Sequence, residues 1–368
     1  MPQTVILHCF PTFAVGGSQI RFIQLANHFG DRYRHLIVPM DGVDSAAERI
    51  GAHVPFSILK LDIPKQNTLK NIGLLRAHLR SVSPDLLITY NWGSVEWGMA
   101  NLFHGCRQIH IEDGFGPDEA HGQKRSRVLT RRAVLSWRAQ VVLPSRTLYD
   151  IASRIWKLPR SHLHYVPNGI DCGRFLQAPV PALTAPFRRH PDDLVIGTVA
   201  ALRAEKNIGR LIDAFALLRA QRGSVRLVIV GDGPERAGLE DKVRSLGLAE
   251  DVFFTGALQV PAQVLRGFDI FALSSNTEQM PYSVLEAMAA ALPLVCTDVG
   301  DVRTMVSAVN RPFVVAPDVV ALGDALSALA GDAALRQSIG ADNLAQVNDL
   351  YHQDKMFARY QAMFDGPP

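Results

Sequence analysis

Short hydrophobic runs and amphipathic segments follow one another along both halves of the chain. Runs rich in Val, Ile, Leu and Phe predict buried strands, whereas apolar residues that recur every three or four positions predict helices. Strands that alternate with helices are typical of α/β proteins with parallel sheets. We predict strands at 5–10, 35–39, 86–90, 108–111 and 141–144 in the first half and at 195–199, 226–230, 252–255, 270–273 and 294–297 in the second. We predict helices at 18–29, 68–82 and 125–138, and then at 207–221, 235–246, 261–267 and 282–291.

The length of the chain and a Pro-rich segment predict two domains. A chain of 368 residues exceeds what one ordinary hydrophobic core organises. The segment 177–191 is rich in Pro and Ala, which is typical of a linker. We therefore predict two doubly wound domains that face each other across a cleft, with ligands at the carboxyl ends of the strands. The expected divisions are a first domain at 1–175, a linker at 176–191, a second domain at 192–345 and a C-terminal helical region at 346–368. The helix of this last region is predicted at 342–364 and crosses back to the first domain.

The composition is that of a globular protein and argues against several classes. Apolar residues make up 48% of the chain and charged residues 20%, and no apolar run approaches the roughly 20 residues that a membrane-spanning helix needs. The first residues lack a basic leader, so we expect a cytoplasmic protein. The 4 cysteines show neither pairing nor metal-ligand spacing, so we expect reduced thiols and no metal site. A net charge of +3 is too small to indicate nucleic-acid binding.

The segment 274–289 carries the strongest chemical signal. A loop with Glu278 follows the predicted strand 270–273, and Pro281 then opens a helix that carries Glu286 among good helix formers. A helix that begins directly after a strand directs its free N–H groups and the positive end of its dipole to the edge of the sheet. A diphosphate is a natural ligand at such a place. Glu278 and Glu286 then stand where they can bind hydroxyl groups on either side of that diphosphate.

Shorter motifs stand at other predicted strand ends. Gly16 and Gly17 follow the first strand, where paired glycines permit either a close backbone approach to a ligand or a plain turn. Arg203 and Lys206 follow the first strand of the second domain, either as phosphate ligands or as solvated loop cations. Gly231 begins a Gly-Asp-Gly-Pro turn after the next strand.

In order and position these motifs resemble those of the retaining glycosyltransferases of family 4, which have the GT-B fold of two Rossmann-like domains. The resemblance extends over essentially the whole chain and includes an Asn-Gly turn at 168–169. One departure is Ala201, which stands where the family has an arginine, so that Arg203 would have to supply the guanidinium from a shifted loop. The resemblance implies an enzyme that uses a UDP- or GDP-linked sugar as co-substrate, without a cofactor. The absence of an Asp-x-Asp triplet argues that no metal clamps the diphosphate.

The resemblance also implies roles for individual residues. Glu286 would bind the ribose hydroxyls and Glu278 the hydroxyls of the donor sugar, while Lys206 with Arg203 would bind the diphosphate. The turn at Gly231 would approach the nucleotide base. The remaining donor-binding groups implied are the Gly16 and Gly17 loop and the backbone of Met280, Pro281, Tyr282 and Ser283.

A polar run, His110-Ile111-Glu112-Asp113, ends the predicted strand 108–111 of the first domain. Several family members contact the donor sugar with a histidine at this point, so the resemblance implies that His110 is a candidate catalytic residue together with Glu278. The alternative is a turn in which His110 is hydrogen-bonded internally. Glu112 or Asp113 would act as a base toward the acceptor hydroxyl. The sequence does not decide between these two carboxylates, and Asp113 stands where some relatives have another residue type.

The segment 124–138 contains six Lys or Arg residues and no carboxylate, and its apolar residues fall largely on one face of a helix. Each cation near an anionic leaflet contributes about 1 kcal/mol of binding. One interpretation is peripheral docking on the inner face of the cell membrane, where a lipid-linked acceptor lies. The other is an ordinary surface helix that packs its apolar face on the sheet. A weaker basic patch consists of Lys70, Arg76 and Arg80.

The expected function is the transfer of a sugar, with retention of configuration, from a nucleotide-diphosphate sugar to a hydroxyl acceptor. By analogy with the family, the acceptor is a lipid-linked or glycan intermediate of exopolysaccharide or lipopolysaccharide assembly. Two alternatives stay open: an epimerase or small-molecule glycosyltransferase with the same fold, and a non-catalytic protein that binds sugar nucleotides. Ala201 favours the non-catalytic alternative, whereas the retained Glu278, Glu286 and Lys206 favour an enzyme.

Overall fold

The computed structural model describes residues 3–63, 67–115, 119, 122–176, 192–258, 260 and 262–366. The chain forms two compact units, an N-terminal unit of Met1–Asn168 and Asp354–Pro368 and a C-terminal unit of Gly169–Gln353. The linker predicted at 176–191 lies, except for Leu176, outside the described residues. The segment 169–175, which the sequence analysis placed in the first domain, belongs to the C-terminal unit.

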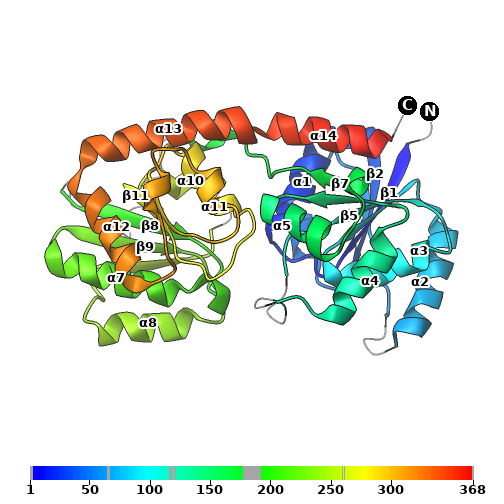
Figure 1. Cartoon of the computed structure of the whole chain (residues 1–368), viewed down its shortest axis with the longest axis horizontal. Helices are drawn as coiled ribbons and strands as arrows, with labels where there is room; N and C mark the ends of the chain where they lie inside the picture. Colours follow the sequence, from blue (N-terminus) through cyan, green and yellow to red (C-terminus); the bar gives the residue numbers. More distant parts are fainter. Residues whose placement is uncertain are drawn as a thin grey trace. The chain divides into compact units, whose positions relative to one another are not determined.

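The N-terminal unit is built on a parallel sheet of 7 strands in the order β3-β2-β1-β4-β5-β6-β7 (Figure 1). The strands are β1 (Thr4–Phe10), β2 (Tyr33–Pro39), β3 (Phe56–Ile58), β4 (Leu86–Tyr90), β5 (Arg107–Ile111), β6 (Ala139–Leu143) and β7 (Leu163–Tyr165). The α-helices are α1 (Gly17–Phe29), α2 (Thr68–Val82), α3 (Val95–Asn101), α4 (Arg125–Leu135), α5 (Arg146–Asp150) and, at the end of the chain, α14 (Gln353–Asp365).

The C-terminal unit has a parallel sheet of 6 strands in the order β10-β9-β8-β11-β12-β13. The strands are β8 (Leu194–Val199), β9 (Val225–Val230), β10 (Val252–Gly256), β11 (Ile270–Leu273), β12 (Leu294–Thr297) and β13 (Val314–Val315). The α-helices are α7 (Ile208–Gln221), α8 (Arg236–Ser245), α9 (Ala262–Leu265), α10 (Tyr282–Ala289), α11 (Val302–Met305), α12 (Val319–Gly331) and α13 (Ala333–Tyr351).

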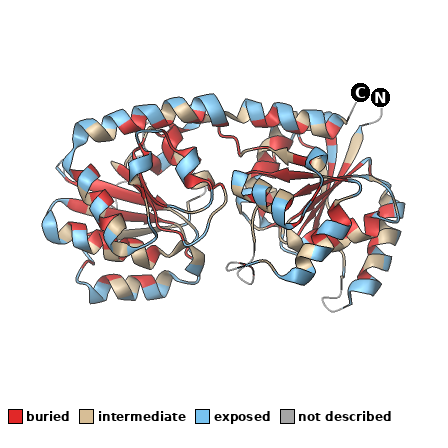
Figure 2. Cartoon of the chain, viewed as in Figure 1, coloured by how far each residue is buried: buried red, intermediate tan, exposed pale blue. Residues whose placement is uncertain are grey.

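The strands are the most buried elements of each unit, and the helices turn one buried face toward them (Figure 2). A strand covered by helices on both faces has no polar side, which explains why the strands appear in the sequence as continuous apolar runs. The last helix, α14, adds Phe357, Tyr360 and Phe364 to the core of the N-terminal unit. Residues from the two ends of the chain therefore share one core.

All strands predicted from the sequence are present, as β1, β2, β4, β5, β6 and β8 to β12. The prediction missed β3, β7 and β13, which lie at sheet edges and are two or three residues long. Strands this short contain no periodic pattern. The prediction also missed the helices α3, α5, α11 and α12, and it extended α4 beyond its end at Leu135.

The single helix predicted at 342–364 is in fact two helices. α13 ends at Tyr351, α14 begins at Gln353, and His352 between them has extended backbone, with φ −60° and ψ 136°. The Ile170 N–H donates to the Tyr351 carbonyl at 2.9 Å, and the Gln353 N–H donates to the Ile170 carbonyl at 3.0 Å. The helix stops at His352 because this residue forms a parallel β-bridge with Ile170.

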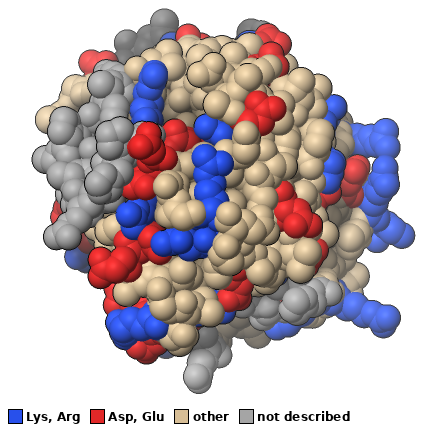
Figure 3. Space-filling view, turned by 90° about the vertical axis from the view of Figure 1, so that its left-hand side faces the viewer, with Lys and Arg blue, Asp and Glu red and all other residues tan. Residues whose placement is uncertain are grey.

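Charged residues of both signs are interspersed on the face of the C-terminal unit that Figure 3 shows. Several cations of this unit are paired with carboxylates. Arg226, for example, contacts Asp193 at 3.1 Å and Asp251 at 2.6 Å, and Arg219 contacts Asp251 at 2.8 Å. A surface of mixed charge is not typical of nucleic-acid binding, which uses a continuous basic patch.

Two buried histidines face each other in the core of the N-terminal unit. His8 on β1 and His35 on β2 are 0% and 1% exposed, and His8 Nε2 lies 2.9 Å from His35 Nδ1. The other ring nitrogen of His8 lies 3.1 Å from the Tyr90 hydroxyl. Burial lowers the pKa of His35 to about 4, and burial together with the charge of His35 holds the pKa of His8 well below its usual value. Both imidazoles are therefore neutral in the folded protein at pH 7.

We expect acid to destabilise the N-terminal unit through this pair. An unfolded histidine has a pKa of about 6.5, so below that pH the unfolded state binds protons at His8 and His35 that the folded state does not bind. The free energy of unfolding should then fall between pH 6.5 and 4, by up to about 1.4 kcal/mol per pH unit for each histidine. Urea unfolding followed by tryptophan fluorescence measures this effect, because all 4 tryptophans belong to this unit.

A pair of glutamine variants tests whether the histidines are responsible. His35→Gln keeps a polar partner for His8 but removes one titrating ring, so the decline of the free energy of unfolding should become shallower. His53→Gln is the matched control, because His53 is an exposed residue of the same unit that bonds the Asn27 carbonyl. The same slope in His35→Gln as in the unmodified protein would contradict the prediction.

Candidate active site

The strand order reverses direction once in each sheet. In the C-terminal unit β8 lies between β9 and β11, and in the N-terminal unit β1 lies between β2 and β4. Ligands of open parallel sheets bind at the carboxyl ends of the strands at such a reversal, because the loops there turn to opposite sides and leave a crevice. The predicted site residues are found near these two places, and each unit is described by itself.

In the C-terminal unit, Lys206 and Glu278 meet at the reversal, since Lys206 follows β8 and Glu278 follows β11. Lys206 Nζ lies 2.6 Å from Glu278 Oε1, and the two side chains are 24% and 9% exposed. The Ser275 hydroxyl donates to the same oxygen at 2.7 Å. Among the described residues no group donates to Glu278 Oε2. This second oxygen is therefore available to accept a hydrogen bond from a ligand hydroxyl.

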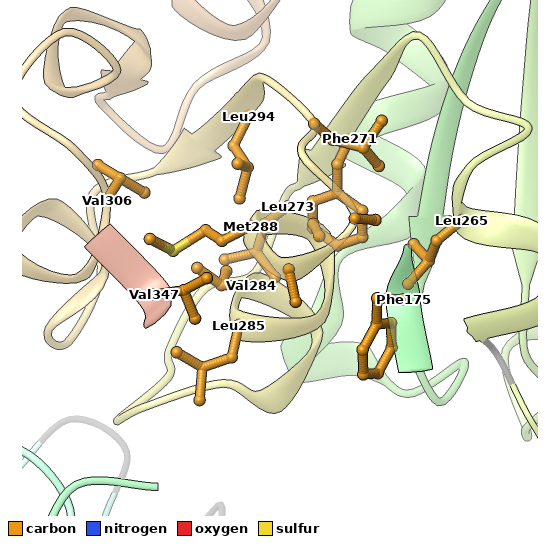
Figure 4. Packing of buried hydrophobic residues seen from close by; sticks show 14 of the residues in the cluster. Phe175, Leu265, Phe271, Leu273, Val284, Leu285, Met288, Leu294, Val306 and Val347 are labelled. Carbon is orange, nitrogen blue, oxygen red and sulfur yellow. The ribbon is translucent and has the colours of Figure 1, made fainter. Parts of the chain in front are cut away.

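The helix α10 is fixed in the core by the apolar side chains of its buried face (Figure 4). Its N-cap is Pro281, whose φ of −67° suits the start of a helix, and the half-buried Glu286 stands on its second turn. Both placements agree with the sequence pattern. The anchoring side chains are Val284, Leu285 and Met288, which pack in one cluster with Leu273, Leu294 and Val347.

Burial raises the pKa of Glu286 to about 7, and the charge of Arg174 acts in the opposite direction. Arg174 belongs to a 3₁₀ turn, Cys172–Phe175, that packs against α10. A carboxyl group with a pKa near 7 is partly protonated at neutral pH. Hydroxyl groups that donate hydrogen bonds favour the ionised carboxylate, so a ligand with such hydroxyls would draw Glu286 into its charged form.

Two glycines allow the loops after β8 and β9 to touch. Gly231 and Gly233 have φ of 146° and 159°, and a Cβ at either position would collide with the backbone of Ala200 or Leu202. The Leu202 N–H donates to the Asp232 carbonyl at 2.9 Å. The Gly-Asp-Gly turn therefore supports the loop that leads to the candidate phosphate ligands.

The two cations of that loop differ in their surroundings. Lys206 is engaged with Glu278, whereas Arg203 is exposed and no partner of its guanidinium is found among the described residues. Ala201, where the family has arginine, is also exposed. The role of Arg203 as a substitute for that arginine stays a prediction.

The loop that carries Glu278 rests on Gly300. Gly300 has a φ of 54°, and a Cβ on it would collide with the carbonyl groups of Glu278 and Gln279. The following residue, Asp301, donates its N–H to the Gln279 carbonyl at 3.0 Å. Both the backbone angle and the close contact require glycine, so Gly300 sets the position of this loop.

In the N-terminal unit, the paired glycines form the start of α1. Gly17 is the first residue of the helix, and Gly16 is its extended N-cap, with φ −164°. The Gln19 side chain lies beside Gly16 and donates to the Thr12 carbonyl at 2.7 Å. The loop is closed by its own side chains, as in a plain turn, and its approach to a ligand stays a prediction.

Asp113 is held by an ion pair at the carboxyl end of β5. Its Oδ2 lies 2.7 Å from Arg21 Nη2, and its N–H donates to Asn91 Oδ1, after β4, at 2.7 Å. Arg21 is 1% exposed and also donates to Asn168 Oδ1 at 2.9 Å. Arg21 therefore connects α1 with Asp113 after β5 and with Asn168, the last residue before the C-terminal unit. A base role of Asp113 would have to operate within this ion pair.

Glu112 and His110 lie in a buried ionic network. Glu112 Oε2 is 3.2 Å from Arg131 Nε and 3.6 Å from His110 Nε2, and His110 Nδ1 is 2.9 Å from the Thr89 hydroxyl. His110 and Glu112 are 2% and 0% exposed. Both ring nitrogens of His110 face groups of the protein, which favours the internal alternative for this histidine.

The central cation of that network, Arg131, belongs to the basic segment 124–138 but does not lie on the surface. Arg131 is 1% exposed and contacts Glu119 at 3.1 Å as well as Glu112, and Arg127 also contacts Glu119 at 3.1 Å. Two buried carboxylates need such a partner because an unpaired buried charge is strongly destabilising. The exposed cations of the segment are Lys124, Arg125, Arg132 and Arg138.

The predicted apolar face of the same segment is also only partly correct. Val134 and Leu135 are buried in the core, but Leu129 and Trp137 are 65% and 75% exposed. Trp137 lies beyond the end of α4 at Leu135, so it no longer follows the helical period.

Sequence reasoning missed several residues that shape the two sites. Arg21 and Arg131 are basic residues at positions that the helical pattern places on the buried face. A charge at such a position was the signal that could have identified them. Nothing in the pattern singles out the residues that support the Glu278 loop. These residues are Ser275, Gly300 and Arg210, whose Nη1 donates to the Ser274 carbonyl at 2.8 Å.

Two family models match the chain, glycosyltransferase family 4 at residues 15–174 and glycosyl transferases group 1 at residues 193–332. The chain belongs to the family 4 glycosyltransferases. The resemblance inferred from the motifs is thereby confirmed.

Two curated relatives illustrate the range of the family. The chain is 26% identical over 356 residues to 2-deoxystreptamine N-acetyl-D-glucosaminyltransferase from Streptomyces fradiae. The alignment covers 87% of this chain and 83% of the relative. It is 30% identical over 278 residues to an exopolysaccharide phosphotransferase from Streptomyces coelicolor. That alignment covers 74% of this chain but 28% of the relative, so most of the relative has no counterpart here.

Among solved structures, HepE from Anabaena in complex with UDP-glucose is similar over 99% of this chain and all of its own, with a TM-score of 0.84 and 17% identity. A likeness at this identity establishes the fold. The predicted α/β class with two Rossmann-like domains of the GT-B type is confirmed.

No helix in the described part of the chain is long and apolar enough to cross a membrane. No group of three or more His, Cys, Asp or Glu side chains among the described residues is arranged to hold a metal ion.

We expect Gly300→Ala to disrupt the Glu278 loop. The methyl group forces the carbonyl groups of Glu278 and Gln279 away and adds strain of about 1–3 kcal/mol at a positive φ. A shift of about 1 Å in a substrate-positioning group reduces the rate roughly a hundredfold, so sugar transfer should fall by one to two orders of magnitude. Steady-state kinetics and the thermal unfolding midpoint measure the two effects.

Gly223→Ala is the control for this substitution. Gly223 lies between α7 and β9 in the same unit, and a Cβ there has no atom within 4 Å. This variant should keep the kinetics of the unmodified protein. Sugar transfer at the unmodified rate in Gly300→Ala would show that the loop does not depend on the glycine.

Proposed function

We propose that this protein is a retaining glycosyltransferase that moves a sugar from a UDP- or GDP-linked donor to a hydroxyl group. The observation that carries the proposal is the contact of Lys206 with Glu278 at the strand reversal of the C-terminal unit, 2.6 Å between Nζ and Oε1. A cation that suits a diphosphate and a carboxylate that suits sugar hydroxyls lie side by side at the place where open parallel sheets bind ligands.

The donor would lie with its diphosphate at Lys206 and the start of α10. Glu278 Oε2 accepts from a hydroxyl of the donor sugar. Glu286, on the second turn of α10, accepts from the ribose hydroxyls. The backbone of Met280, Pro281, Tyr282 and Ser283 and the turn at Gly231 complete the donor site. The structure of HepE with UDP-glucose supports a nucleotide sugar as the donor class.

The departing nucleotide would be stabilised by fixed charges without a metal ion. As the sugar bond breaks, negative charge builds up on the diphosphate, and preorganised cations and helix N-termini lower the barrier most when they are aimed at that charge. Lys206, Arg203 and α10 supply these groups. The acceptor hydroxyl attacks from the side of the leaving group, whose phosphate oxygen takes its proton, which gives retention without a nucleophile from the protein.

The acceptor is proposed to be a lipid-linked or glycan intermediate in the assembly of exopolysaccharide or lipopolysaccharide. The name of the Streptomyces coelicolor relative supports a polysaccharide setting. The Streptomyces fradiae relative, whose name gives a small aminocyclitol as acceptor, supports the alternative of small-molecule transfer. A role as a non-catalytic binding protein is the third possibility and is disfavoured by the intact Lys206 and Glu278 pair.

Peripheral contact with the inner face of the cell membrane is part of this proposal for a cytoplasmic enzyme. The exposed cations Arg125, Arg132 and Arg138 occur in the same segment as the exposed Leu129 and Trp137. Cations bind the anionic lipid surface, and an exposed tryptophan is the side chain that prefers the headgroup region.

The donor prediction is tested by a thermal-shift screen against UDP-, GDP- and ADP-sugars with and without EDTA. A ligand that binds only the folded state raises the unfolding midpoint by mass action. We expect a shift with UDP- or GDP-sugars that EDTA does not change. Glu286→Ala should abolish the shift because it removes the ribose contacts.

Glu278→Gln separates catalysis from binding in the same screen. This variant should keep the shift given by UDP or GDP but lose turnover of the sugar nucleotide. No shift with any sugar nucleotide, or a shift that EDTA abolishes, would contradict the donor site as proposed. Turnover by Glu278→Gln at the unmodified rate would remove Glu278 from the catalytic residues.

The membrane prediction is tested by co-sedimentation with vesicles. We expect the protein to sediment with vesicles that contain anionic lipid at low salt and to be released at high salt. Replacing Arg125, Arg132 and Arg138 together by alanine should weaken binding about a hundredfold, at about 1 kcal/mol for each cation. Val320→Ser, an exposed apolar position of the C-terminal unit, is a control that should bind normally. Equal binding of the triple variant would exclude this segment as the contact.

A further inference from the structure

The candidate donor site depends on two loops that belong to different strands. The lysine loop, residues 203–207, follows β8, and the glutamate loop, residues 274–280, follows β11. Neither loop has regular structure apart from a single 3₁₀ turn in the lysine loop. A loop holds a side chain in a fixed position only if other groups bond its backbone.

Hydrogen bonds join the two loops directly. The Asn276 N–H donates to the Glu205 carbonyl at 2.8 Å, and the Ser274 hydroxyl donates to the Lys206 carbonyl at 3.1 Å. Asn207 Nδ2 donates to Asn276 Oδ1 at 3.1 Å. The positions of Lys206 and Glu278 are therefore coupled through the bases of their loops.

Arg210, on the first turn of α7, binds three successive residues of the glutamate loop. Its Nη1 donates to the Ser274 carbonyl at 2.8 Å and lies 3.5 Å from the Ser275 carbonyl, and its Nη2 donates to Asn276 Oδ1 at 2.7 Å. The planar guanidinium reaches these acceptors at once, which a lysine ammonium cannot do in the same geometry. The start of α7 is itself fixed, because Asn207 Oδ1 accepts from the Arg210 N–H at 3.1 Å.

Arg210 is connected to the Glu278 carboxylate through Ser275. The Ser275 carbonyl accepts from Thr297 Oγ1 at 2.8 Å and lies beside the Arg210 guanidinium, while the Ser275 hydroxyl donates to Glu278 Oε1. A displaced Ser275 would withdraw one of the two donors that orient the Glu278 carboxylate. The other donor, Lys206, would then be left to orient it alone.

We propose that Arg210 is a positioning residue of the donor site, which holds the glutamate loop so that Glu278 Oε2 meets the donor sugar. This inference rests on the proposed function. Both terminal nitrogens of Arg210 bond the glutamate loop, which is the geometry of a positioning residue. Burial lowers the pKa of the half-buried Arg210, against the opposing effect of Asp318.

The test compares Arg210→Lys and Arg210→Met with the unmodified protein in two measurements. Isothermal titration with UDP and with GDP measures binding of the nucleotide, and release of UDP or GDP from UDP-glucose or GDP-mannose in water measures cleavage of the sugar bond. A misplaced Glu278 should reduce kcat for this release roughly ten- to hundredfold. The Kd for the nucleotide, whose ribose contact on α10 is untouched, should change less than about threefold by the same positional argument.

Arg219→Lys is the matched control, since Arg219 lies on the same helix and pairs with Asp251 at 2.8 Å. It should leave both measurements unchanged. Asn276→Ala removes an acceptor of the same network and should reproduce the loss of kcat. The double variant Arg210→Met with Asn276→Ala should lose no more than the more impaired single variant, because the two act as one unit.

The outcomes separate the two proposals. If the unmodified protein binds neither nucleotide and cleaves neither sugar, the proposed function fails and Arg210 has no donor site to position. If the unmodified protein binds and cleaves but Arg210→Lys and Arg210→Met match its kcat, the positioning role is wrong while the proposed function stands. An equal loss of nucleotide affinity with an unchanged kcat would also overturn it, because Arg210 would then contact the nucleotide.

Discussion

The contact between Lys206 and Glu278 is the interaction on which the candidate donor site depends. It forms only because β8 and β11 are neighbours in the sheet, although 70 residues separate Val199 from Ile270 in the chain. Glycine at 300 permits the required backbone, Arg210 bonds the backbone of the glutamate loop, and Ser275 within the loop donates to Glu278. Lys206, Glu278, Arg210 and Gly300 belong to four separate segments, so the site is a product of the fold of the whole C-terminal unit.

The carboxylates of the two units differ in whether they can bind a ligand without losing an ion pair. Glu278 is paired near solvent and has one oxygen with no donor among the described residues, so a ligand hydroxyl can bind without leaving a charge unpaired. Glu112 is fully buried against Arg131, and Asp113 is bound to a buried Arg21. Separating a buried pair leaves an uncompensated charge at a cost of several kcal/mol. Binding chemistry therefore fits Glu278, whereas the other two carboxylates fit the fixing of strand ends.

The longer strands and the donor motifs were predictable from the sequence because each depends on local pattern, whereas the short edge strands β3, β7 and β13 were not. Apolar runs mark β8 and β11, and Pro281 with the helix formers behind it marks α10. The break at His352 was not predictable, because it depends on pairing with Ile170, almost two hundred residues earlier in the chain. The burial of Arg131 was not predictable for a similar reason. Its partners, Glu112 and Glu119, lie outside the basic segment and meet it only after β5 and α4 have packed.

The absence of arginine at position 201 is compatible with donor chemistry in this geometry. Lys206 bonds Glu278, and this pairing keeps its ammonium beside the carboxylate. In the proposed donor site, a diphosphate at the start of α10 would bring two negative charges to a place where the helix dipole and Lys206 favour them. Arg203 is exposed and flanks the same loop, so it can turn toward the phosphates without breaking an ion pair seen among the described residues. The geometry is therefore compatible with the prediction that Arg203 supplies the guanidinium that position 201 lacks.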